Sequence, residues 1–180
     1  RKPPQQRTPS PPPTPRRRVS RRSSVPFVGL TGGIGSGKST ALAALERLGA
    51  ATLSTDQVVH ELYESPEVRD PVLERFGTVD RGELARRAFA TPADREWLEG
   101  LLWPKVGERM VAWRTQIPDT APAAVVEVPL LFESGMEAAF DATIAVIADE
   151  ELRAARAGAR GHEALAERSE RQLTQQEKAQ

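Results

Sequence analysis

A glycine-rich phosphate-binding motif between an apolar run and a helix-periodic segment constrains the fold of this chain most strongly. Residues 32–39 read Gly-Gly-Ile-Gly-Ser-Gly-Lys-Ser and fit the P-loop pattern, G-x-x-x-x-G-K followed by Ser or Thr. The apolar segment 25–31 predicts a buried strand, and the periodic segment 41–48 predicts an amphipathic helix. This strand–loop–helix setting favours an α/β phosphate site over a glycine-rich turn with an incidental lysine.

Each residue type in the motif has a chemical role toward a phosphate. Glycines let the backbone curl so that successive N–H groups point inward at phosphate oxygens. Lys38 has the reach for the β- and γ-phosphates, and the Ser39 hydroxyl can ligate Mg²⁺. We expect ATP with Mg²⁺ as the cofactors, and we expect these residues to bind the nucleotide: Gly33, Ile34, Gly35, Ser36, Gly37, Lys38, Ser39 and Thr40.

Charge separates a short basic N-terminal segment from a longer acidic remainder. Residues 1–24 hold eight basic residues, no acidic residue and seven of the fifteen prolines. Residues 25–180 hold 17 basic and 25 acidic residues. Because residues 1–24 cannot bury a core, we expect a disordered, solvated tail that binds nucleic acid weakly at most. Residues 25–180 are expected to form one globular domain.

Several chemistries are missing from the chain. It has no cysteine, so it has no disulfide, thiolate metal site or cysteine nucleophile. It has no run of ~20 apolar residues, so no membrane-spanning helix is expected, and we predict a cytoplasmic location. His60 and His162 stand alone without ligand-like spacing, and both are predicted to have surface or packing roles.

The order of expected elements predicts a parallel sheet covered by helices. Strands are expected at 26–31, 50–55, 123–128 and 142–147, and the last two are apolar enough to be buried on both faces. Helices are expected at 38–48, at 57–64, through most of 67–113 and in 149–180, with a break near 158–161. A plain crossover needs about a dozen residues, so the long helical segment between the second and third strands indicates an inserted substrate pocket.

Two carboxylates follow strands whose carboxyl ends are expected to face the nucleotide. Ligands of open α/β sheets bind outside the carboxyl ends of the strands, and Asp56 follows the second strand. Asp56 is expected to accept a proton from an acceptor hydroxyl or to order Mg²⁺ waters, with a helix N-cap as the alternative. Glu133, which follows the third strand, is a candidate for holding the second substrate or the metal shell, with a plain loop carboxylate as the alternative.

Arginines are concentrated in the C-terminal helical segment. Arg156 and Arg160 belong to this set, and mobile arginines can stabilise the charge that spreads over a transferred phosphoryl group. Glutamates are interleaved with these arginines, and such a pattern is also typical of a salt-bridged face exposed to solvent.

With these motifs assembled, the chain resembles the dephospho-coenzyme A kinase family over residues 26–180. The most specific match pairs Leu-Thr-Gly-Gly-Ile-Gly-Ser-Gly-Lys-Ser at 30–39 with Val-Pro-Leu-Leu-Phe-Glu at 128–133. Asp56, Arg95 and Arg156 continue the match. The resemblance implies a P-loop kinase fold and phosphorylation by ATP of the ribose 3′-hydroxyl of dephospho-CoA, the last step of coenzyme A synthesis.

The resemblance also implies roles for individual segments and residues. Segment 57–115 would be the CoA-binding insertion, and segment 155–180 would be a helical lid. Catalytic roles would belong to Lys38, Asp56, Arg156 and Arg160, and substrate contacts to Arg95 and Glu133. The family pattern adds a fifth strand and a helix after the stretch that ends here at Gln180, so we expect a C-terminal truncation relative to that pattern.

Two other functions stay open on the residues alone. One is a P-loop kinase for another small-molecule acceptor. The other is a non-catalytic ATP-binding protein that uses its basic tail. The oligomeric state is not predicted by any of these features.

Overall fold

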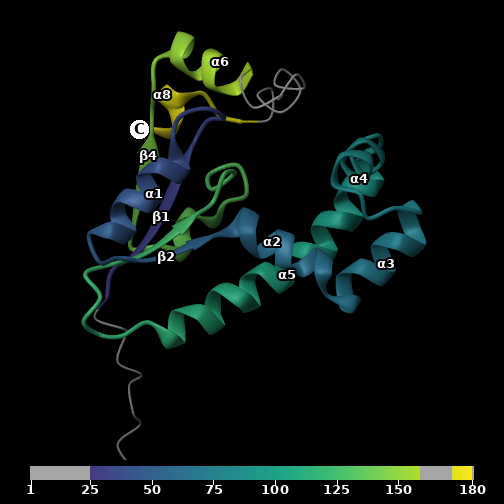
Figure 1. The fold of residues 1–180 in the computed structure, drawn as a ribbon, viewed down its shortest axis with the longest axis horizontal. Coiled ribbons are helices and arrows are strands. Elements are labelled where there is room, and N and C mark those ends of the chain that lie inside the picture. The colour runs from purple at the N-terminus through teal and green to yellow at the C-terminus, as the bar shows by residue number, and fades with distance from the viewer. Residues whose placement is uncertain (1–24, 159–171, 180) are drawn as a thin grey trace, which may run out of the picture.

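The computed structural model describes residues 25–158 and 172–179 of the chain. Within them, four strands form one parallel sheet: β1 (Phe27–Gly32), β2 (Ala51–Ser54), β3 (Ala124–Glu127) and β4 (Ala142–Val146). Their order across the sheet is β2-β3-β1-β4 (Figure 1). The predicted α/β fold with four readable parallel strands is thereby confirmed, and the carboxyl ends of all four strands meet at one edge.

The helices lie where the connections between parallel strands require them. Helix α1 (Lys38–Arg47) follows β1, and α2 (Thr55–Glu64), α3 (Pro66–Phe76), α4 (Arg81–Ala88) and α5 (Pro92–Gln116) connect β2 to β3. A short 3₁₀-helix η1 (Met136–Ala139) precedes β4, and α6 (Glu150–Gly158) and α8 (Gln175–Lys178) follow it. In Figure 1, α3 and α4 stand away from the sheet while α5 runs back toward it, which is the arrangement expected of an insertion.

Local sequence signals set the boundaries of the inserted helices. Gly77 ends α3 at φ 67°, a left-handed conformation that glycine adopts without strain. Asp80 caps α4 by accepting a hydrogen bond from the Glu83 N–H, and Thr91 caps α5 through the Asp94 N–H. The insertion is therefore divided into α3, α4 and α5 by residues whose capping chemistry is readable in the sequence.

The main hydrophobic core joins the insertion to one face of the sheet. Apolar side chains recur at helical spacing along α2, α3 and α5, and their buried faces meet strands β1 and β3. The buried members of this core include Phe27, Val58, Leu62, Val68, Val72, Phe76, Leu98, Leu102, Val106, Met110 and Val126. One continuous core therefore holds the inserted helices against the sheet.

Strand β4 differs from the sequence-based expectation. Its apolar residues predicted a strand buried on both faces, yet Ala142, Thr143 and Ile144 are exposed, and Ile144 is 41% accessible. The reason is position: among the strands of residues 25–158 and 172–179, β4 pairs with β1 alone and lies at the edge of the sheet. An apolar run is compatible with an edge strand as well as a central one, because pattern alone does not reveal the neighbours.

Two expectations lie outside the described residues. The predicted disordered tail occupies residues 1–24, and the predicted break near 158–161 falls largely in the segment 159–171. Among the helices of residues 25–158 and 172–179, none combines the length and the apolar character needed to cross a membrane.

Candidate active site

The P-loop connects the end of β1 to the start of α1. Gly35 has φ 76° and Gly37 has φ 100°, so both adopt left-handed conformations that other residues rarely take. Gly37 occupies the N-cap position of α1, and no side chain caps this helix terminus. The first N–H groups of α1 are thus left for an anion, with the positive end of the helix dipole behind them.

Lys38 folds back over the loop. Its Nζ donates hydrogen bonds to the carbonyl oxygens of Gly32 (2.9 Å) and Gly33 (3.1 Å). Burial lowers the pKa of the Lys38 ammonium, and the carboxylates of Glu127 and Asp56 partly oppose that shift. The ammonium is thus held beside the loop, with carboxylates near enough to affect its charge.

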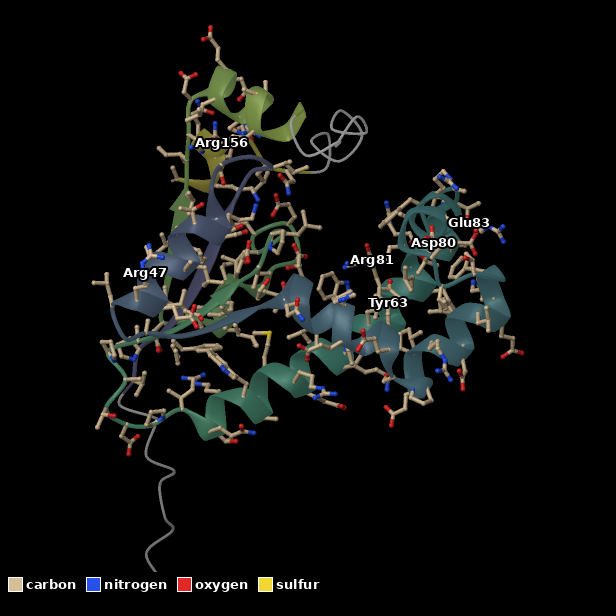
Figure 2. All side chains as sticks on the ribbon, viewed as in Figure 1. Arg47, Tyr63, Asp80, Arg81, Glu83 and Arg156 are labelled. Carbon is tan, nitrogen blue, oxygen red and sulfur yellow. The ribbon has the colours of Figure 1, made fainter. Side chains whose placement is uncertain are left out.

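Helix α6 covers the P-loop with two arginines. Arg153 Nε donates to the Ile34 carbonyl at 3.1 Å, and Arg156 Nη1 lies 3.5 Å from the Gly35 carbonyl oxygen. A Cβ built on Gly35 would lie 2.6 Å from the Arg153 carbonyl oxygen, so only glycine permits this close approach. Figure 2 shows the predicted residue Arg156 on α6, next to the β1–α1 loop. Arg153, which belongs to the same C-terminal set of arginines but was not predicted to be catalytic, makes the shorter contact.

Asp56 lies in the first turn of α2, immediately after β2 ends at Ser54. The N-cap position belongs to Ser54, so the alternative role of Asp56 as the N-cap is wrong. The preceding Thr55 is buried, and its hydroxyl donates to the Glu127 carbonyl at 2.9 Å. This hydrogen bond fixes the start of α2 against the end of β3 and brings Asp56 to the carboxyl edge of the sheet.

A cavity of about 390 Å³ opens beside the P-loop at this edge. It is lined by Ser39, Leu42, Ala43, Glu46, Ser54, Asp56, Gln57, His60, Arg81 and Glu127. The cavity connects the end of the P-loop, through Ser39, with Asp56 and with the inserted helices. Its two basic residues were not predicted to belong to a site: His60 was predicted to have a surface or packing role, and Arg81 was not considered.

The donor set of this cavity fits a magnesium ion. Ser39 supplies a hydroxyl, and Asp56 and Glu127 supply carboxylates to the same cavity. Among the described residues no group of three or more His, Cys, Asp or Glu side chains is placed to hold a metal. Mg²⁺ does not need such a cage, because it binds through one or two carboxylates together with nucleotide phosphates and waters.

Glu133 makes contacts of a structural kind. Its Oε1 lies 2.8 Å from Lys178 Nζ and accepts a hydrogen bond from the Leu173 N–H. Lys178 also donates to the Pro129 carbonyl at 3.1 Å. The side chains of Lys178 and Glu133 are 1% and 14% accessible, and Glu133 is not among the residues that line the cavity. The pair fastens segment 172–179 to the loop after β3, and a substrate contact by Glu133 stays a prediction.

Breaking this buried ion pair is expected to destabilise the protein. Lys178→Met should lower the free energy of unfolding by about 3–5 kcal/mol, because Glu133 would be left buried without its counter-charge. Denaturant unfolding measures the effect. The double variant Lys178→Met/Glu133→Leu should recover most of the loss, since it removes both charges.

A surface pair of the same chemistry supplies the control. Lys105 pairs with Glu67 at 3.0 Å, and the Glu67 side chain is 78% accessible. Lys105→Met should leave the free energy of unfolding nearly unchanged, because solvent screens exposed charges. Equal effects of Lys178→Met and Lys105→Met would contradict a stabilising role for the buried pair.

Two further predicted residues do not join the cavity. Arg95 lies in the first turns of α5, where its Nε is 3.9 Å from Glu99 Oε1, and it is not among the lining residues. Its substrate role stays a prediction. Arg160 lies outside the described residues.

A P-loop after the first strand of a parallel sheet, a helical insertion after the second and arginines over the loop together define a P-loop small-molecule kinase. The chain belongs to the dephospho-CoA kinase family, whose sequence model matches residues 26–180. This confirms the family predicted from the motifs.

Individual relatives agree with this assignment, and two solved structures share the fold. The dephospho-CoA kinase of Deinococcus radiodurans is 40% identical over 84% of this chain and 78% of that relative. The dephospho-CoA kinase of Moorella thermoacetica is 38% identical over 84% and 76%. The crystal structure of TT1252 from Thermus thermophilus matches with a TM-score of 0.76 at 32% identity, over 86% of this chain and 84% of that one. The dephospho-CoA kinase from Campylobacter jejuni matches with a TM-score of 0.53 at 20% identity, over 82% and 85%, and shares the fold.

Proposed function

We propose that this chain transfers the γ-phosphoryl group of ATP to the ribose 3′-hydroxyl of dephospho-CoA. Membership of the dephospho-CoA kinase family supports the reaction and its acceptor. The observation that carries the proposal to individual residues is the cavity that joins Ser39 of the P-loop to Asp56 and the inserted helices. It offers room for an acceptor beside the phosphates of a bound nucleotide.

The proposed transfer uses groups of this chain on both sides of the phosphoryl group. The acceptor hydroxyl oxygen attacks the γ-phosphorus, the bond from that phosphorus to the β–γ bridging oxygen breaks, and ADP leaves. Asp56 accepts the proton of the attacking hydroxyl. Lys38 and the N–H groups of the P-loop stabilise the charge that develops on the phosphate oxygens. Arg156, which lies over the loop, adds further positive charge there.

Magnesium belongs to this proposal as a cofactor. Ser39 would ligate the ion, and the carboxylates of Asp56 and Glu127 would accept hydrogen bonds from its waters. When bound, Mg²⁺ neutralises charge on the β- and γ-phosphates and orients them for transfer. A cytoplasmic location stays a prediction.

The experiment is a product assay with purified protein, Mg·ATP and a panel of acceptors. Chromatography should show coenzyme A formed from dephospho-CoA in step with ADP, and adenosine and pantetheine should react far more slowly. A variant without residues 1–24 should retain this activity, since these residues precede the first strand. Release of ADP without coenzyme A, or preference for another acceptor, would contradict the proposal.

A further inference from the structure

The cavity contains two basic side chains that phosphoryl transfer itself does not use. His60 and Arg81 line it together with the acidic residues Glu46, Asp56 and Glu127. The three carboxylates repel any phosphate that enters the cavity, so the two basic side chains are candidates for offsetting that repulsion. An acceptor that carries phosphates needs positive charge where its phosphates lie.

Arg81 has a guanidinium that the described protein leaves unpaired. It is the first residue of α4 and is exposed, and within residues 25–158 and 172–179 it makes no hydrogen bond or ion pair. Two other arginines of the insertion are paired: Arg75 binds Asp94, and Arg87 binds Glu83. The five donors of the Arg81 guanidinium are thus free for a ligand.

The position of Arg81 relative to Asp56 follows from α2. Asp56 and His60 are four residues apart and share one face of the helix, so His60 lies about 6 Å further along the axis. Tyr63 follows about one turn later. Burial raises the pKa of the Tyr63 phenol, and the nearby Arg81 guanidinium partly offsets that shift. Figure 2 shows Arg81, at the start of α4, next to Tyr63 of α2. Arg81 therefore marks the end of the cavity away from Ser39.

We propose that Arg81, with His60 beside it, binds the diphosphate group of the acceptor. The inference rests on the proposed function, in which the ribose 3′-hydroxyl of dephospho-CoA faces Asp56. The diphosphate is attached through C5′ of that same ribose, so it lies within one or two helical turns of Asp56, about 5–10 Å away. A guanidinium matches phosphate oxygens through two parallel hydrogen bonds, which supplies both the charge and the orientation.

The separation of the two phosphate sites distinguishes the acceptor from ATP. The phosphates of ATP belong to the P-loop at the Ser39 end of the cavity, whereas Arg81 comes from the insertion at the other end. Arg81 is accordingly a substrate-binding residue that acts before the transfer step, and its loss should affect acceptor affinity more than turnover.

The test compares Arg81→Ala with Arg81→Lys and with Arg86→Ala. Arg86 is also exposed on α4 but does not line the cavity, so it controls for the loss of one positive charge from the same helix. Arg81→Ala should raise KM for dephospho-CoA by about 10–100-fold, with kcat within about threefold and KM for ATP within about twofold. Arg81→Lys should recover part of the loss, because it keeps the charge without the fork. Arg86→Ala should match the unmodified protein.

Each outcome separates this inference from the function on which it rests. If the unmodified protein fails to phosphorylate dephospho-CoA, the proposed function is wrong. If it succeeds and Arg81→Ala leaves KM for dephospho-CoA unchanged, Arg81 does not bind the diphosphate. A rise in KM for ATP alone would assign Arg81 to the donor phosphates and overturn the inference. Calorimetric titration with dephospho-CoA in the absence of ATP checks the affinity loss, and Arg81→Gln replaces Arg81→Ala if the alanine variant does not fold.

Discussion

Asp56→Asn is expected to lower turnover by about 10²–10⁴-fold, the usual contribution of general-base help, while ATP affinity stays within about tenfold. The side chain lines the cavity beside Ser39, and the buried hydrogen bond from Thr55 to the Glu127 carbonyl fixes the helix turn that carries it. Asparagine keeps the size of the side chain but cannot accept the hydroxyl proton. Coenzyme A formation under saturating substrates measures turnover, and nucleotide titration measures affinity.

Glu64→Gln is the matched control for Asp56→Asn. Glu64 ends the same helix, is exposed and does not line the cavity, so its loss removes an equal charge without touching the site. Its turnover should be that of the unmodified protein. If Asp56→Asn instead abolishes Mg·ATP binding while bound substrate still reacts, Asp56 serves the metal and another group accepts the proton.

Lys38→Ala is expected to lower kcat/KM by about 10²-fold or more while the protein stays folded. The ammonium donates hydrogen bonds to two carbonyl oxygens of the loop. Phosphate oxygens can replace these carbonyl oxygens as acceptors when ATP binds. Its loss removes charge stabilisation that the transition state needs most. Steady-state kinetics of coenzyme A formation measures the effect, and Lys105→Ala controls for the removal of a lysine elsewhere.

The lowered pKa of Lys38 gives the sign of its effect on stability. Burial penalises the charged form in the folded protein, so at every pH below the folded-state pKa the ammonium costs stability relative to the unfolded chain. Lys38→Ala should therefore leave the free energy of unfolding at neutral pH unchanged or raise it. If Lys38→Ala instead melts at a clearly lower temperature than the unmodified protein, Lys38 supports the fold and its kinetic effect is indirect.

Some structural features were already determined by the sequence. The P-loop at 32–39 predicted a strand before it and a helix after it, because the motif binds phosphate between the end of a strand and the start of a helix. Thr91 before Pro92 began α5, and Gly77 ended α3, through capping preferences that act within a few residues. The helix predicted at 57–64 begins one residue after Asp56, and because α2 in fact begins at Thr55, Asp56 and His60 share one face of it.

Other features were decided only by tertiary structure. Arg81, the first residue of α4, lines the cavity together with residues of α1 and α2, and Lys178 contacts Glu133 because α8 docks against the loop after β3. Arg153 of α6 makes a closer contact with the P-loop than Arg156 does, which follows from how α6 packs over the loop. The apolar strand β4 is exposed because of its place at the sheet edge. Capping and periodicity act over a few residues, whereas each of these pairings joins elements far apart in the chain, and only the packed core sets which of them meet.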